Sequence, residues 1–146
     1  MIARSLAVLA LVPVVLSGCS STKDSAGDFT GAKQPVAQAI EDLQDAGRSG
    51  NAKKICSELL AASARKRVEA AGNGKTCADV LDKQLDDADT FELTVVSVSL
   101  DGAKGGSGAT NATARVKSTE NGKDRFDLFT LVKESGRWRV QGLGGV

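Results

Sequence analysis

The spacing of apolar residues changes once along the chain, near Asp89, and this change limits the folds that the chain can form. Before Asp89 the apolar residues recur three and four positions apart, which is the spacing of amphipathic helices. After Asp89 they alternate with polar residues, which is the spacing of half-buried strands. Helices followed by strands in a chain of 146 residues predict a single α+β domain, in which N-terminal helices pack against a four-stranded antiparallel sheet.

Three helices are predicted in the first part. Pro35 begins the first helix, because its fixed φ angle and missing N–H are tolerated in a first turn, and Gly47 ends it. Asn51 and Thr76 are suited to cap the second and third helices, and Ser63 is suited to cap a further turn or two between them. The apolar faces of the three helices comprise Val36, Ala39, Ile40 and Leu43; Ile55, Cys56, Leu59 and Leu60; and Cys77, Val80, Leu81 and Leu85.

Four strands are predicted in the second part, joined as a meander. In the first of them the alternation changes phase between Val95 and Val96, which predicts a bulge or bend. Asn121-Gly122 is a strong tight-turn signal, and Ser135-Gly136 also predicts a turn. The predicted strands are 90–100, 109–118, 124–133 and 137–143, with a loose connection at 101–108.

The first 18 residues have the features of a secretory signal peptide. Arg4 gives a basic start, an apolar run follows from Leu6 to Leu16, and the small residues Ser17 and Gly18 suit a cleavage site. The apolar run is too short for a membrane span. Residues 1–18 are therefore expected to be removed on export.

The four residues Leu16-Ser17-Gly18-Cys19 resemble the bacterial lipobox, in which an aliphatic residue and two small residues precede an obligatory cysteine. The resemblance implies transfer of a diacylglyceryl group to the Cys19 thiol and cleavage after Gly18. The mature protein is then a lipoprotein of the cell membrane, held on its extracytoplasmic side by two or three acyl chains. The alternative is an ordinary signal peptide with a coincidental cysteine.

The segment that follows Cys19 is small and polar as far as Gln34. Such a segment buries too little apolar surface to offset the entropy lost on ordering, so residues 19–34 are predicted to form a flexible tether. Residues 35–146 are then the single folded domain.

Two further cysteines, Cys56 and Cys77, remain once Cys19 is assigned to lipid. An even pair in an exported protein predicts a disulfide, which would join the second helix to the start of the third. The alternative is two buried free thiols. The chain has 19 basic and 18 acidic residues, and this balance argues against nucleic acid as a partner, because nucleic-acid binding favours a pronounced basic excess.

The order of the elements, the Cys56 and Cys77 pair, and the closing strand G-R-W-R-V-Q-G-L at 136–143 resemble the cystatin-like, or nuclear transport factor two-like, cone fold. Among such proteins the chain is similar to small bacterial lipoproteins with a lumazine-binding-like domain of unknown function. The resemblance covers about residues 35–143 and implies a curved four-stranded sheet wrapped around a long helix, with a pocket between them. The candidate apolar walls of that pocket, which are also expected core residues because of their size, are Phe91, Leu93, Phe129, Leu131 and Trp138.

The sequence contains no His and no Tyr, which removes the commonest general base, the commonest metal ligand and the phenol donor. No catalytic residue, metal site or cofactor is therefore assigned. Asp127 is the exception to consider, because a charge in the middle of a strand is unusual. It either points into the pocket, where it could act as a base, or pairs on the other side of the sheet with Arg125, Arg137 or Arg139.

These observations favour a non-catalytic, membrane-anchored module that binds an envelope protein or a small ligand. One alternative is a carrier or sensor of a small apolar molecule in the cone cavity. A second is an enzyme of the cone-fold type that uses Asp127.

Overall fold

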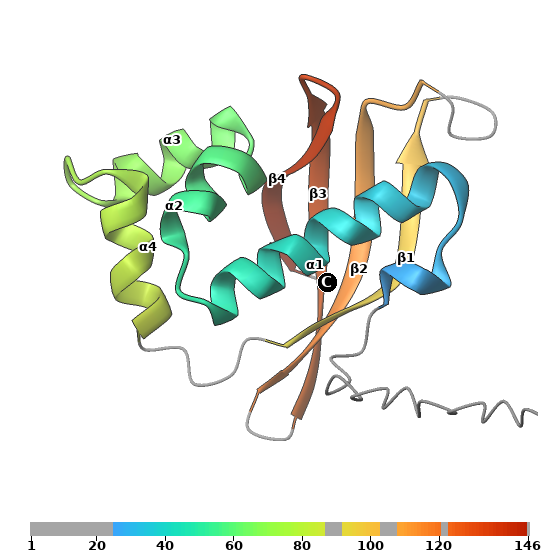
Figure 1. The fold of residues 1–146 in the computed structure, drawn as a ribbon, viewed down its shortest axis with the longest axis horizontal. Helices are drawn as coiled ribbons and strands as arrows, with labels where there is room; N and C mark the ends of the chain where they lie inside the picture. The colour runs from blue at the N-terminus through green and yellow to red at the C-terminus, as the bar shows by residue number, and fades with distance from the viewer. Residues whose placement is uncertain (1–24, 87–91, 103–107, 121–122, 146) are drawn as a thin grey trace, which may run out of the picture.

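The computed structural model describes residues 25–86, 92–102, 108–120 and 123–145. The predicted signal peptide, Cys19, Phe91 and the Asn121-Gly122 turn lie outside these residues. The described chain forms an antiparallel sheet with a long helix, α1, across one side, and a group of shorter helices beside the sheet (Figure 1). The predicted α+β arrangement of helices on a four-stranded antiparallel sheet is confirmed.

The sheet is a meander of β1 (Leu93–Asp101), β2 (Asn111–Glu120), β3 (Lys123–Glu134) and β4 (Arg137–Gly145), in that spatial order. The predicted irregularity in β1 is confirmed, because the pairing with β2 shifts register between Val95 and Ser97. Val96 is the extra residue of this bulge. Ser135 and Gly136 both have positive φ angles, of 51° and 80°, as a two-residue turn between twisted antiparallel strands requires.

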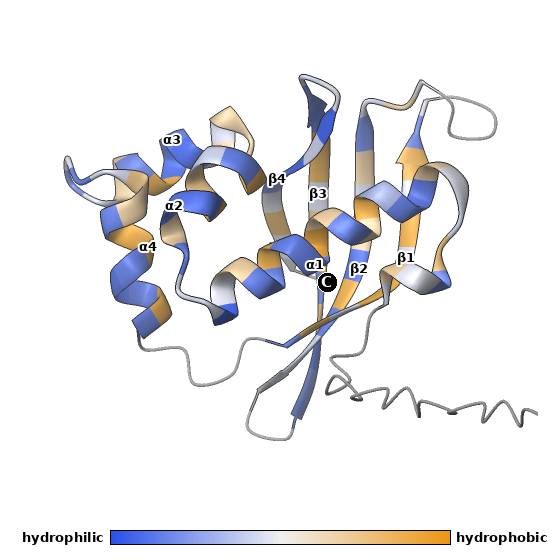
Figure 2. Cartoon of the chain, viewed as in Figure 1, coloured by the Kyte–Doolittle hydropathy of each residue, from blue (hydrophilic) through white to orange (hydrophobic). Residues whose placement is uncertain are grey.

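Helix α1 (Gln34–Arg48) covers one side of the sheet, with Pro35 in its first turn as predicted. Hydrophobic and hydrophilic bands alternate along this helix (Figure 2). Val36 and Ile40 are fully buried, and they belong to the same core cluster as Val116 of β2 and Leu131 of β3. Burial of these branched side chains on both elements supplies the main apolar stabilisation of the domain.

The shorter helices form a lobe beside β4, made of α2 (Ala52–Lys54), the π-helical turn η3 (Ile55–Leu59), α3 (Ala62–Ala71) and α4 (Cys77–Asp86) (Figure 1). Asn51 caps α2 as predicted, because its side chain accepts a hydrogen bond of 3.0 Å from the Lys54 amide. Thr76 precedes α4, and its hydroxyl accepts a hydrogen bond of 3.2 Å from the Asp79 amide. The prediction that Ser63 caps the middle helix is wrong, because the N-cap residue of α3 is Ala61 and Ser63 lies inside the helix.

The predicted disulfide joins Cys56 of η3 to Cys77 at the start of α4, with a Cα–Cα distance of 6.0 Å. Close packing between α3 and α4 accompanies it. Gly72 ends α3 against Val80 of α4, where an added Cβ would meet the Val80 Cγ2 atom at 2.3 Å. A side chain larger than hydrogen at position 72 would therefore push the two helices apart.

Residues 25–34, which the tether prediction assigns to a flexible segment, are folded against the domain. Residues 25–34 contain two short 3₁₀ turns, η1 (Ala26–Asp28) and η2 (Gly31–Lys33), and both Ser25 and Ala26 are buried. The Ser25 hydroxyl donates to the Glu41 carboxylate of α1 and accepts from the Val95 amide of β1, at 3.2 and 3.1 Å. These specific hydrogen bonds order a segment whose composition alone favours a flexible coil, which corrects the predicted boundary at Gln34.

Removing the disulfide is expected to destabilise the domain. Its 21-residue sequence separation corresponds to about 3 kcal/mol of unfolding free energy in the chain-entropy account. A Cys56→Ala/Cys77→Ala variant should therefore unfold at lower urea concentration than the oxidised wild type, as monitored by Trp138 fluorescence. Wild-type protein treated with reductant should lose similar stability, and a variant as stable as the wild type would contradict the prediction.

Candidate functional site

Four of the apolar side chains predicted as pocket walls are in the described part of the chain, and all four lie in the core. Leu93, Phe129, Leu131 and Trp138 are 8, 6, 1 and 8% exposed and share one cluster with the buried face of α1. The pairing of β3 with β2 and β4 places Phe129 opposite Ala114 and Leu143, and Leu131 opposite Ala112 and Val140. Leu143 is 69% exposed, whereas Ala112, Ala114 and Val140 are buried. Around these three partners the side between sheet and helix is packed protein interior, as expected for the largest side chains of a small domain.

The sequence leaves two interpretations of Asp127, as a base that faces the pocket or as an ion-pair partner of an Arg on the other side of the sheet. The structure agrees with each of them in one respect. Strand alternation places it on the same side of β3 as Phe129 and Leu131, which is the side that faces α1. Its Oδ1 atom lies 3.4 Å from Arg125 Nε, and its side chain is 23% exposed. The carboxylate is thus on the side that the catalytic interpretation requires, and its partner is one that the structural interpretation names.

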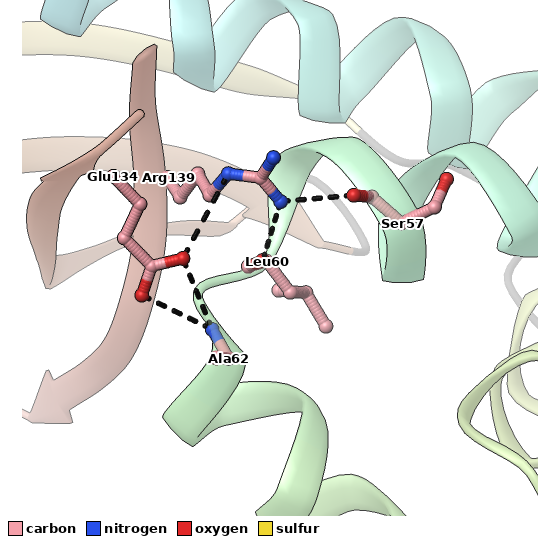
Figure 3. Close-up of polar contacts among 5 residues, drawn as sticks. All are labelled: Ser57, Leu60, Ala62, Glu134 and Arg139. Carbon is pink, nitrogen blue, oxygen red and sulfur yellow. Dashed lines mark hydrogen bonds and ion pairs between the residues drawn. The ribbon is translucent and has the colours of Figure 1, made fainter. Parts of the chain in front are cut away.

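A second charged cluster lies around Arg139 (Figure 3). The sequence pattern does not predict it, because its members are far apart in the chain. The Arg139 guanidinium donates to the main-chain carbonyl oxygens of Ser57 and Leu60, at 2.9 and 3.4 Å. Its Nε atom lies 3.9 Å from the Glu134 carboxylate, and that carboxylate accepts a hydrogen bond of 3.2 Å from the Ala62 amide. We call Arg139, Glu134 and their main-chain partners the β4 clamp.

The charges of the β4 clamp match the polarity of the helix ends that they contact. Arg139 binds carbonyls at the end of η3, where main-chain acceptors lack helical partners, and Glu134 binds an amide at the start of α3, where donors lack them. Ala61, which precedes α3, has no side chain that could cap it, so a carboxylate distant in sequence takes this role. The β4 clamp therefore positions the lobe on the sheet and has a structural function.

The outer side of the sheet, which faces away from α1, carries a patch of apolar and basic side chains. Val96 and Phe126 are exposed by 47% and 38%. The Arg115 guanidinium carbon lies 4.5 Å from the centre of the Phe126 ring, in a cation–π contact. Lys117 is paired with Asp124, with 3.4 Å between Nζ and Oδ2. We call Val96, Arg115, Lys117 and Phe126 the outer patch.

Asp124 at the border of the outer patch has a lowered pKa. The Thr119 hydroxyl donates a hydrogen bond of 2.9 Å to its Oδ1 atom, and this bond is the largest cause of the lowered pKa of the carboxyl. Desolvation is the next largest effect and raises the pKa, while the positive charge and the hydrogen bond of Lys117 lower it further. Asp124 therefore stays ionised and keeps Lys117 in place on the outer side.

Residues that could support metal chemistry are not grouped together in the part of the chain that the structure describes, where no three His, Cys, Asp or Glu side chains are arranged to hold a metal ion. Across residues 25–86, 92–102, 108–120 and 123–145, no helix has both the length and the apolar character needed to cross a membrane. The candidate functional features of the described residues are therefore the outer patch, the β4 clamp and the ion pair of Asp127 with Arg125.

Comparison with known proteins identifies the fold. The chain is similar to a crystal structure of an NTF-2 like protein of unknown function from Silicibacter pomeroyi, with a TM-score of 0.50 and 16% identity, over 79% of this chain and 96% of that chain. No protein-family model and no curated protein matches the sequence. At this identity the likeness extends to the fold alone, and the similarity to lumazine-binding-like lipoproteins stays a prediction. The chain thus has an NTF2-like α+β fold.

Two variants of Glu134 should separate the contribution of its hydrogen bond to the Ala62 amide from the contribution of its negative charge. Glu134→Ala removes both and is expected to cost about 1 kcal/mol of unfolding free energy, as loss of a helix cap typically does. Glu134→Gln keeps an acceptor for the Ala62 amide and should lose less. Urea unfolding measures both, with the exposed neighbour Arg137→Gln as a control expected to stay within about 0.5 kcal/mol of wild type. Equal stability of Glu134→Ala and wild type would show that the carboxylate does not cap α3.

The lowered pKa of Asp124 should depend on Thr119. Thr119→Val removes the hydroxyl donor, so the pKa of Asp124 should rise toward its ordinary value, and Lys117→Gln should raise it less. Because the folded pKa is lowered, the contribution of Asp124 to stability is present above the ordinary aspartate pKa and is lost as the pH falls through the folded pKa. Carbon-detected NMR titration of the carboxyl group measures these shifts, and an unchanged titration in Thr119→Val would contradict the assignment.

Proposed function

We propose that this protein is an exported lipoprotein, anchored through Cys19 on the extracytoplasmic side of the cell membrane, and that its domain is a non-catalytic interaction module. The observation that carries the proposal is the Cys56–Cys77 disulfide between η3 and α4. Stable disulfides form in oxidising compartments and are rare in the cytosol. The signal-like residues 1–18 and the Leu16-Ser17-Gly18-Cys19 sequence support the same destination.

The types and positions of the side chains support the non-catalytic part of the proposal. The sequence lacks His and Tyr, and the described apolar side chains first considered as pocket walls belong to the core. Arg139 and Glu134 of the β4 clamp both form hydrogen bonds with main-chain groups of the same chain. Binding through the surface of the domain is therefore favoured over chemistry in its interior.

Substitution of Cys19 tests the anchor. Wild-type protein recovered from a bacterial host should lack residues 1–18, carry the mass of acyl chains, and sediment with membranes. Cys19→Ser has no thiol to acylate and should lose both the added mass and the sedimentation. Cys56→Ser/Cys77→Ser is the matched control, because it removes two cysteines and should keep the lipid.

The binding role is tested in the same strains by chemical cross-linking in intact cells. A specific cross-linked partner should form with the wild type and be reduced for Cys19→Ser, which is no longer held at the membrane. Wild-type protein recovered with Met1 still present and no added mass would contradict the proposed anchoring.

A further inference from the structure

The path of the chain into the fold limits how an anchored domain can be oriented. Ser25 is 3% exposed and is hydrogen-bonded to Val95 of β1, so the chain is fixed to the β1 edge of the sheet from this residue onward. Only residues 20–24 separate it from Cys19. The six Cα-to-Cα steps from Cys19 to Ser25 span at most about 20 Å even when fully extended. An anchor on Cys19 therefore holds the β1 edge near the bilayer surface.

Two surfaces adjoin this point of attachment, and their charges differ in sign. Residues 25–48, which form η1, η2 and α1, contain four acidic and two basic residues. The arm of β2 and β3 from Arg115 to Arg125 contains four basic and two acidic residues. Bacterial and other anionic lipid headgroups attract basic surfaces and repel acidic ones. The charge pattern thus favours contact through the sheet arm.

The outer patch adds apolar side chains to this arm. The bulge places two consecutive residues, Val96 and Ser97, in exposed positions, whereas Val95 and Val98 on either side of them are buried. Val96 follows directly after Val95, the residue bonded to Ser25. Phe126 lies two strands away, on the same side as Arg115, which packs on its ring. Aromatic and aliphatic side chains flanked by Arg and Lys suit the interface between headgroups and acyl chains.

We infer that the outer patch, Val96, Arg115, Lys117 and Phe126, rests on the anionic lipid surface to which the protein is anchored. The inference rests on the lipid anchor of the proposed function. It goes further by stating which face of the domain meets the membrane and that this face contacts anionic lipid. The basic residues of α3 are less suited to this contact. Arg67 donates to the Gln141 carbonyl of β4, and β4 is the edge of the sheet opposite to β1.

The test uses the acylated full-length protein, reconstituted in vesicles of phosphatidylglycerol with brominated phosphatidylcholine. Phe126→Trp places a fluorophore in the outer patch, and Leu143→Trp is the matched control, because Leu143 is an exposed apolar residue on β4. Bromine quenches tryptophan at the level of the acyl chains. The wild type, measured in parallel, gives the contribution of Trp138, whose burial also makes its emission a check of folding.

Phe126→Trp should be quenched at least twofold more strongly than Leu143→Trp. Adding Arg115→Gln and Lys117→Gln to Phe126→Trp should reduce that quenching at least twofold while circular dichroism stays unchanged. Equal quenching at the two positions, or stronger quenching at position 143, would overturn the inference while leaving the anchor intact. Protein recovered without acyl chains would instead contradict the proposed function, and this inference with it.

Discussion

The structure depends on the burial of one side of the sheet by a single helix. Val36 and Ile40 of α1 are fully buried in one cluster with Val116 and Leu131 of the sheet. Because side chains alternate along a strand, each inward residue commits its neighbours to the opposite side. α1 leaves that opposite side uncovered, so the domain has one side devoted to stability and another available for contact. The outer patch follows from this division.

The lobe beside β4 is held by a different kind of interaction. Among the residues of α3 and α4, only Ala64 and Cys77 are buried, and Leu81 and Leu85 pack against the core while partly buried. Apolar burial therefore attaches these helices less completely than it attaches α1. Two further interactions stabilise the lobe. The Cys56–Cys77 disulfide links η3 covalently to α4. In the β4 clamp, Arg139 and Glu134 bond main-chain groups at helix ends of matching polarity. A small domain with a modest core commonly needs such additional links.

The sequence predicts the features that depend on local spacing and local chemistry. The helix begun by Pro35, the Asn51 cap, the bulge near Val96 and the disulfide all follow from residues close together in the chain or from a simple pairing of cysteines. The NTF2-like fold agrees with the resemblance that rests on the order of the elements, the Cys56 and Cys77 pair and the closing strand at 136–143.

Features that depend on contacts between distant residues could not be predicted in this way. Ser25 is ordered by a strand 70 positions away, and α3 is capped by Glu134, 72 positions from Ala62. Strand alternation could have placed Asp127 beside Phe129 and Leu131, but its partner depended on the conformation of Arg125. The outer patch could not be found from composition, because its residues come from three strands and are grouped only by the pairing of those strands.

The hydrogen bonds along β1 have a consequence for solubility. A strand at the edge of a sheet offers unpaired main-chain groups on which another chain can add a strand. Here the Val95 amide is bonded to the Ser25 hydroxyl and the Leu93 amide to the Gln44 side chain. On the opposite edge, the Val140 carbonyl accepts a bond of 2.8 Å from the Ala61 amide. Groups from the same chain thus occupy main-chain donors and acceptors at both edges of the sheet, and these positions cannot pair with a strand of another molecule.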